Sequence, residues 1–100
     1  MKGYKIMTSK QRAYLRSLAS TINPIYQIGK SGVTPELTKG VDEALEAREL
    51  VKINILKNCM DDPRQMAEML AERTGSQVVQ IIGRKIVLFR QSEKSPKIKI

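Results

Sequence analysis

Residues 25–35 have the sequence IYQIGKSGVTP, and this short stretch combines a strand, a glycine loop and the start of a helix. Ile25 to Ile28 contain two β-branched residues and one aromatic residue, which predicts a short strand. Thr34 suits the N-cap of a helix, and Pro35 suits its first position, where the N–H would have no partner anyway. The four residues between them, 29–32, must therefore lead the chain from a strand into a helix.

Upstream of this unit, residues 8–11 have the form of a capping box, which predicts the start of a first helix. The apolar side chains that follow have helical spacing: Leu15, Leu18, Ala19 and Ile22. Asn23-Pro24 should end this helix, because the residue before a proline disfavours the helical conformation. We expect Arg12 and Arg16 to lie one turn apart on the opposite face, free to contact solvent or phosphate.

Downstream of the unit, a second helix and a second strand are predicted. The buried stripe of the helix that begins at Pro35 consists of Leu37, Val41, Ala44 and Leu45. Gly40 lies beside that stripe and lowers helix propensity by about 1 kcal/mol relative to alanine, so we expect a close approach to the sheet there. Residues 50–56 alternate between apolar and polar side chains, with Lys52 and Asn54 on the polar side. This alternation predicts a strand with one buried and one partly wet face.

The last third of the chain predicts a third helix and a hairpin. Asp62-Pro63 repeats the cap-plus-proline signal, and Gly75 should stop the helix. We expect its core stripe to be Met66, Met69 and Leu70. The runs 78–82 and 86–89 are rich in β-branched residues and are joined by Gly83-Arg84, a pair that suits a type II′ turn. This turn should display Arg84 and Lys85.

The element order is therefore helix, strand, helix, strand, helix, strand, strand. Two strand-helix-strand units followed by a hairpin predict a single-domain α/β fold with a four-stranded mixed sheet packed with helices. One hundred residues allow one core and not two. We place the domain at residues 8–91 and expect residues 1–7 and 92–100 to be flexible tails, because the last stretch is too polar and too short to pack.

Composition excludes several classes of function. The chain has no histidine and one cysteine, Cys59, so the commonest zinc sites and general-base arrangements cannot be built. A catalytic thiol usually needs a basic partner, so we expect a packing role for Cys59, no cofactor, no metal and no enzymatic activity. No apolar run approaches the roughly 20 residues that span a bilayer, and the start lacks the apolar core of a signal peptide. A soluble, cytoplasmic protein is expected.

The charge of +8 is unevenly distributed along the chain. Residues 1–34 carry six basic and no acidic side chains, residues 35–83 carry six basic and nine acidic ones, and residues 84–100 carry six basic ones against Glu93 alone. If the two ends meet in space, the molecule has a basic face, which is typical of nucleic-acid binding. Charge alone leaves open an alternative without specific function, namely an ordinary charged surface with flexible basic tails.

The loop Gly29-Lys30-Ser31-Gly32 allows three interpretations. A nucleotide-binding P-loop requires a glycine five positions before Gly29, where this chain has Pro24, so that interpretation fails on spacing. An ordinary strand-to-helix turn would also use glycines. The third interpretation is a clamp for a nucleic-acid backbone of the kind found in KH modules, in which glycines allow a close approach and Lys30 supplies charge. The motif by itself does not choose between the last two.

A wider set of residues resembles one family. Residues 11–19 (QRAYLRSLA), Pro24, residues 28–34 (IGKSGVT), 49–52 (ELVK) and 79–90 (VQIIGRKIVLFR) resemble the YhbY family of stand-alone bacterial CRM (chloroplast RNA splicing and ribosome maturation) domains, in order and spacing, from about Thr8 to Arg90. The resemblance implies a fold similar to the C-terminal domain of translation initiation factor three. It also implies RNA binding, association with precursors of the large ribosomal subunit, and a GxxG loop within the RNA-binding surface. Phe89 departs from the family, which frequently has tyrosine there.

These observations predict one basic surface that binds structured RNA, with ribosomal RNA of large-subunit precursors as the partner. Its predicted members are Lys10, Arg12, Arg16, Gly29, Lys30, Ser31, Gly32, Lys52, Lys57, Arg84 and Lys85. Arg12 and Arg16 would act as phosphate forks, Lys30 as a point charge, and Arg84 as a reader or clamp at the hairpin turn. Few aromatic residues are present, so we expect salt-dependent binding with weak sequence preference.

The partner classes that follow are limited. We expect a monomer without a small-molecule substrate and without membrane binding, because no amphipathic helix exposes apolar residues. The alternative to RNA binding is a protein-interaction module that engages a ribosome-assembly or translation partner through the acidic second and third helices.

Overall fold

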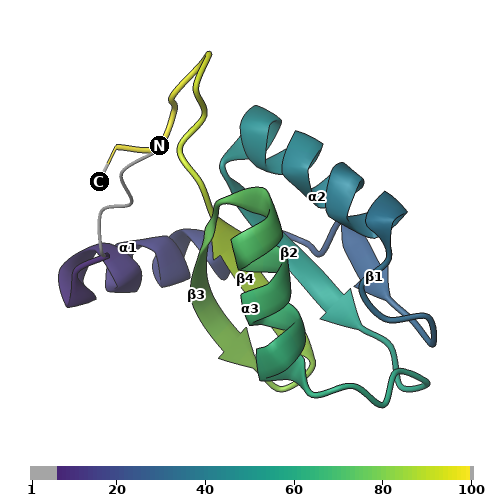
Figure 1. Ribbon diagram of the computed structural model, residues 1–100. Coiled ribbons are helices and arrows are strands. Elements are labelled where there is room, and N and C mark those ends of the chain that lie inside the picture. Colours follow the sequence, from purple (N-terminus) through teal and green to yellow (C-terminus); the bar gives the residue numbers. More distant parts are fainter. Residues whose placement is uncertain (1–6, 100) are drawn as a thin grey trace.

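The computed structural model describes residues 7–99 and has the predicted order of elements (Figure 1). The helices are α1 (Ser9–Ala19), α2 (Pro35–Arg48) and α3 (Pro63–Thr74), and the strands are β1 (Tyr26–Ile28), β2 (Leu50–Ile55), β3 (Gln77–Ile82) and β4 (Lys85–Phe89). The strands form one four-stranded mixed sheet. The prediction of an α/β fold with such a sheet is confirmed.

The sheet has the order β1-β2-β4-β3, so the last strand lies inside it. β1 runs parallel to β2, while β4 runs antiparallel to both of its neighbours, β2 and β3. β2 and β3 therefore point the same way, which is what a helical crossover between them requires. Register shifts between Val78 and Gln80, where β3 has a β-bulge against β4.

The two faces of the sheet carry separate apolar cores. Helices α2 and α3 cover one face over Val51, Ile53 and Ile55 of β2, and in Figure 1 they lie together, apart from α1. Helix α1 covers the other face over Val79 and Phe89 and buries Leu15 and Ala19 there, along with Leu50 and Val87. β4 is buried on both faces by this arrangement. Helix α1 covers its face only in part, because Lys85 and Ile82 at the hairpin end remain exposed.

Local capping explains where the helices begin. Thr8 and Gln11 form the predicted capping box: the Gln11 N–H donates to Thr8 Oγ1 at 3.1 Å, and the Thr8 N–H donates to Gln11 Oε1 at 2.9 Å. Thr34 and Asp62 cap α2 and α3, each before a proline: their side chains accept from the N–H groups of Leu37 and Gln65. Gly75 ends α3 in the left-handed conformation, as predicted.

Helix α1 ends earlier than predicted, at Ala19 and not at Asn23. The hydroxyls of Ser20 and Thr21 donate to the carbonyls of Ser17 and Leu18, which tightens the chain into a turn. Ile22 still packs against the core on the α1 face. The segment from Ser20 to Ile25 is thereby free to cross toward β1.

Two predictions about helix interiors have different outcomes. Gly40 does mark a close approach, since a Cβ there would lie 2.7 Å from Tyr26 Oη and 2.9 Å from the ring of that β1 residue. Met69 was wrongly placed in the core of α3, where it is 40% exposed. The buried positions are instead Met66, Ala67 and Leu70.

The C-terminal segment differs most from its prediction. Residues 92–99 were expected to be too polar to pack, yet Ser92 is buried and Ile98 packs against the core on the α1 face. Met7 at the other end is buried as well, while residues 1–6 of the predicted tail and Ile100 lie outside the described part of the chain. The expectation that residues 92–99 do not pack was therefore wrong.

Glu49 is the physical reason for this packing. Its side chain is buried, and its backbone has φ 70°, a left-handed conformation that costs a non-glycine residue about 1 kcal/mol or more. The carboxylate accepts hydrogen bonds from the N–H groups of Ser92 (2.7 Å), Lys97 (2.7 Å) and Ile98 (2.6 Å). Burial raises the pKa of Glu49, but these donors and the Lys97 ammonium outweigh burial, so the pKa is lowered overall.

Glu46, one turn earlier on α2, holds the same segment. Its carboxylate accepts from Ser92 Oγ at 2.6 Å and from the N–H groups of Glu93 and Lys94 at 3.2 and 3.1 Å. The Ser92 hydroxyl and these two N–H groups lower the pKa of Glu46 to about 2. Both carboxylates must be ionised to accept this many hydrogen bonds, so the attachment of residues 92–98 depends on pH.

This dependence can be measured as acid sensitivity of folding. A carboxylate whose pKa is lower in the folded than in the unfolded chain stabilises the fold above its ordinary pKa, and this stabilisation is lost as the pH falls toward the folded value. For Glu46 that range runs from its ordinary 4.5 down to about 2. We expect the free energy of unfolding, followed by circular dichroism in urea, to fall less steeply with acid in Glu46→Gln than in the wild type.

The matched control is Glu43→Gln, which removes an exposed carboxylate of the same helix that does not hold residues 92–98. This variant should keep the wild-type acid slope. An equal change of slope in both variants would mean that Glu46 has no special part in holding the segment.

Candidate nucleic-acid interface

The glycine loop forms a tight turn between β1 and α2. The Gly32 N–H donates to the Gly29 carbonyl at 3.0 Å, which closes the turn and leaves Lys30 and Ser31 exposed at its tip. Gly32 is buried with φ 69°, and a Cβ there would lie 2.7 Å from Asp61 Oδ2. Gly32 is therefore required by the fold itself.

Gly29 is different from Gly32. Its backbone does not need the left-handed region, and an added Cβ would make only ordinary contacts, 3.6 Å to Leu56 Cδ1 and 3.8 Å to Asn58 Oδ1. The fold therefore gives no steric reason for a glycine at position 29. A small residue there leaves the loop backbone open to a ligand from outside.

The two glycines should respond differently to alanine. Gly32→Ala should destabilise the protein by about 1–3 kcal/mol, because alanine is strained at positive φ and meets Asp61. Gly29→Ala should stay within about 0.5 kcal/mol of the wild type. Urea unfolding followed by circular dichroism measures both, and equal losses would show that the fold needs both glycines alike.

Arg84 at the hairpin turn was predicted to read or clamp RNA, and the structure shows that its guanidinium also has partners within the protein. It donates to three main-chain carbonyls at the end of β2 and in the loop after it: Nε to Ile55 at 3.1 Å, and Nη2 to Leu56 at 2.6 Å and Cys59 at 3.0 Å. These bonds tie the hairpin turn to the 56–61 loop, and that loop in turn contacts Gly29 and Gly32. All three loops lie at the lower edge of Figure 1.

Arg12 was predicted to be free on α1, and this was wrong. Its Nη1 donates to the carbonyls of Val78 and Val79 at 2.7 and 2.8 Å, at the β-bulge of β3. Sequence spacing could not reveal this role, because the acceptors lie more than sixty residues away in the chain. Arg12 fixes α1 to the sheet, with its guanidinium engaged by the protein.

The structural role of Arg84 can be tested against that of its neighbour. Arg84→Ala should destabilise the protein by about 1–3 kcal/mol, because the carbonyls of Ile55, Leu56 and Cys59 each lose the hydrogen bond from the guanidinium. Lys85→Ala should change stability by less than about 0.5 kcal/mol, since Lys85 is exposed. Thermal unfolding of both variants checks this. Unchanged stability in Arg84→Ala would show that Arg84 has no structural role.

Three of the predicted cations meet on the open part of the sheet. Lys85 of β4 pairs with Asn54 and Ile82, while Val87, two residues on, pairs with Lys52. Paired residues point to the same face of the sheet, so these side chains lie on the α1 face, in the part that the helix leaves uncovered. They surround a hollow of about 190 Å³, which is lined by Arg16, Ala19, Ser20, Lys52, Gln80, Ile82, Lys85 and Val87.

Two more of the cations that were predicted to bind RNA lie on loops at the hairpin end of the sheet. Lys30 is exposed at the tip of the glycine loop, and Lys57 is exposed in the loop after β2, beside Asn58, which contacts Gly29. Lys10 does not join them, because in Figure 1 the first turn of α1 and the glycine loop lie at opposite sides of the molecule. We call the set Arg16, Lys30, Lys52, Lys57 and Lys85 the cationic surface.

The charges of the cationic surface are uncompensated. Within residues 7–99, no salt bridge joins any of its members to a carboxylate, whereas Arg90 pairs with Asp42 and Glu46 on α2. An acidic group, Asp61, lies beside Gly32 in the glycine loop. Unpaired cations from one helix, two strands and two loops therefore concentrate at one end of the sheet.

Sequence analysis missed the polar and apolar neighbours of these cations. Gln80 and Ile82 line the hollow, and Ile82 is 56% exposed. Strand alternation alone could not place them, because the bulge in β3 shifts the register by one residue and lets Val79 enter the core while Gln80 lines the hollow. Met60 in the 56–61 loop is 91% exposed and was also not singled out.

Other kinds of site leave no trace in the described part of the chain. Nowhere in residues 7–99 do three or more histidine, cysteine or acidic side chains gather as metal ligands would. None of the helices in that range combines the length and apolarity that a bilayer crossing requires. Cys59 is buried with its thiol directed at the Met66 sulfur at 3.7 Å, which agrees with the predicted packing role.

Comparison with known proteins agrees with this architecture, a three-helix, four-strand α/β domain with a glycine loop. Residues 7–90 match the model of the CRS1 / YhbY (CRM) domain. The chain belongs to this family, which confirms the resemblance.

Several relatives match over most of their length. The chain is 44% identical to Probable RNA-binding protein YqeI of Bacillus subtilis, over 95% of this chain and 99% of the relative. It is 33% identical to a protein of Methanocaldococcus jannaschii, also named a probable RNA-binding protein, over 94% of this chain and 76% of the relative. The solution structure of a hypothetical protein from Staphylococcus aureus superimposes with a TM-score of 0.80 at 46% identity, covering 95% and 99% of the two chains.

Proposed function

We propose that this protein binds RNA through the cationic surface and the glycine loop, and that it acts by binding and not by catalysis. The observation that carries the proposal is the gathering of Arg16, Lys52 and Lys85 around a hollow on the open part of the sheet, with Lys30 and Lys57 on nearby loops. None of these five cations has a carboxylate partner within residues 7–99. Relatives named as RNA-binding proteins support the same class of ligand.

Phosphate contact is the mode of binding that fits these residues. Arg16, Lys52 and Lys85 surround one hollow, so together they present several donors to adjacent phosphates of a strand. Lys30 extends the positive potential to the tip of the loop, where Gly29 leaves the backbone accessible. Binding of this kind is sensitive to salt, because each contacted phosphate releases counterions.

The particular RNA that we propose is ribosomal RNA in precursors of the large ribosomal subunit. This part of the proposal rests on the family resemblance, and the GxxG loop is the element we assign to the RNA backbone. Sedimentation of ribosomal particles from cells, with and without RNase, followed by sequencing of RNA crosslinked to the protein, tests it. Crosslinks confined to messenger or transfer RNA would contradict it.

The alternative of an acidic protein-docking surface is weakened by the internal use of the α2 carboxylates. Asp42 pairs with Arg90, while Glu46 and Glu49 hold residues 92–98. Besides Asp42, the exposed acidic residues of α2 and α3 are Glu36, Glu43, Glu68 and Glu72. Co-sedimentation with ribosomes that survives RNase would favour this alternative.

A double substitution tests the cationic surface directly. We expect the variant Arg16→Ala with Lys30→Ala to bind large-subunit ribosomal RNA about tenfold or more weakly, because two phosphate contacts are lost. The slope of log affinity against log salt should become shallower by about 1 for each lost contact. Filter binding over a range of salt concentrations measures both quantities.

The matched control is Lys39→Ala with Arg73→Ala, which removes one exposed lysine and one exposed arginine from α2 and α3, on the opposite side of the sheet. This control has the same net charge as the test variant and should retain most of the affinity. Equal weakening in both would show that net charge alone attracts RNA, and unchanged binding in the test variant would rule out the cationic surface.

A further inference from the structure

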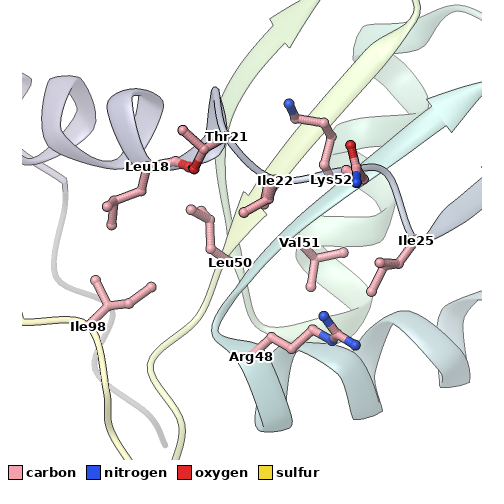
Figure 2. A pocket seen from close by; sticks show the side chains of 10 residues that line it. Leu18, Thr21, Ile22, Ile25, Arg48, Leu50, Val51, Lys52 and Ile98 are labelled. Carbon is pink, nitrogen blue, oxygen red and sulfur yellow. The ribbon is translucent and has the colours of Figure 1, made fainter.

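A second and larger hollow lies on the other side of Lys52. Its volume is about 620 Å³, within the range of about 300–1,000 Å³ typical of small-ligand sites. Its lining residues come from the end of α1, the crossing segment to β1, the α2–β2 junction and the C-terminal segment: Leu18, Thr21, Ile22, Asn23, Ile25, Arg48, Leu50, Val51, Lys52 and Ile98. Figure 2 shows Lys52 and Arg48 on opposite sides of this hollow, with Ile22, Leu50 and Val51 between them.

The chemistry of the lining is aliphatic walls with cations at the rim. Ile25, directly before β1, is 39% exposed and lines the hollow. Arg48 and Lys52 have no salt-bridge partner among the described residues, and no carboxylate lines the hollow. The Thr21 hydroxyl and the Asn23 amide add hydrogen-bonding groups. A flat, apolar ligand that carries a negative charge complements such a site.

The position of the hollow identifies that ligand. Lys52 lines both this hollow and the smaller one that holds Arg16 and Lys85. An RNA strand whose phosphates contact Arg16, Lys52 and Lys85 therefore passes the mouth of the larger hollow. Among the parts of such a strand, only a nucleobase that is not paired in a helix can leave the stack and enter an apolar recess.

We propose that the larger hollow receives one unpaired nucleobase of the bound RNA, with Lys52 and Arg48 contacting the phosphates on either side of that nucleotide. This inference rests on the proposed function and narrows it, because it makes the ligand an RNA with a bulge or loop, and not a fully paired helix. It also supplies a base contact that aliphatic side chains provide in place of aromatic stacking.

Three stem-loop RNAs test the proposal: one with a single bulged adenosine, the same RNA with an abasic ribose at the bulge, and a fully paired version. We expect the wild type to bind the bulged RNA about tenfold more tightly than the abasic one, which has the same number of phosphates. With Ile25→Glu, which places a carboxylate in the hollow, the two affinities should become equal. The ratio between the two RNAs cancels the general effect of added negative charge.

Met69→Glu is the matched control, because Met69 is 40% exposed, close to the 39% of Ile25, and lies on α3, away from the hollow. This variant should keep the tenfold preference. Equal binding of bulged and abasic RNA by the wild type, or a preference that persists in Ile25→Glu, would overturn the base site while leaving RNA binding intact. Failure of the wild type to bind any of the three RNAs would instead overturn the proposed function.

Discussion

The position of helix α1 on the sheet depends on the hydrogen bonds that Arg12 donates to the carbonyls of Val78 and Val79, together with the packing of Leu15 and Ala19. In a regular strand, successive carbonyls point in opposite directions, but the bulge in β3 breaks this alternation and lets one guanidinium nitrogen reach two neighbours. Helix α1 is thereby fixed across one end of the sheet face. The other end stays open, and there Arg16, Lys52 and Lys85 surround a hollow. An arginine with a structural role thus determines where the free cations lie.

Carboxylates of α2 have partners within the protein, whereas the cations on the opposite sheet face do not have carboxylate partners among residues 7–99. The carboxylates near the end of α2 are occupied: Asp42 bonds Arg90, and Glu46 and Glu49 accept from the backbone of the C-terminal segment. The cations of the opposite sheet face have no such partners among residues 7–99. Arg16, Lys52 and Lys85 therefore remain available to an anionic ligand at the uncovered part of the sheet.

Features encoded by neighbouring residues were predictable from the sequence. Caps at Thr8, Thr34 and Asp62, the stop at Gly75, and the two-residue turn at Gly83 all follow from short-range hydrogen bonding or backbone freedom. The element order and the family resemblance predicted one four-stranded mixed sheet, but not the order of its strands. These signals sufficed to place every element within a few residues.

Features encoded by long-range contacts were not predictable. In the sequence, Arg12 and Arg84 look like free surface cations. The carbonyls that accept from Arg12 lie 66 and 67 residues away in the chain, and those that accept from Arg84 lie 25 to 29 residues away. Residues 92–98 lack any apolar periodicity, and their packing depends on the buried carboxylate of Glu49, some 43 to 49 residues earlier. The prediction that Met69 is buried was wrong for a simpler reason, because helical spacing allows either Met69 or Ala67 to face the core.

The attachment of the C-terminal segment determines which residues belong to the folded domain. The family match ends at Arg90, but the three N–H groups that neutralise the buried Glu49 carboxylate belong to Ser92, Lys97 and Ile98. A module cut at the family boundary would lose all three of these donors. The smallest piece of this chain that can be moved intact into another protein is therefore longer than the conserved domain and extends at least to Ile98.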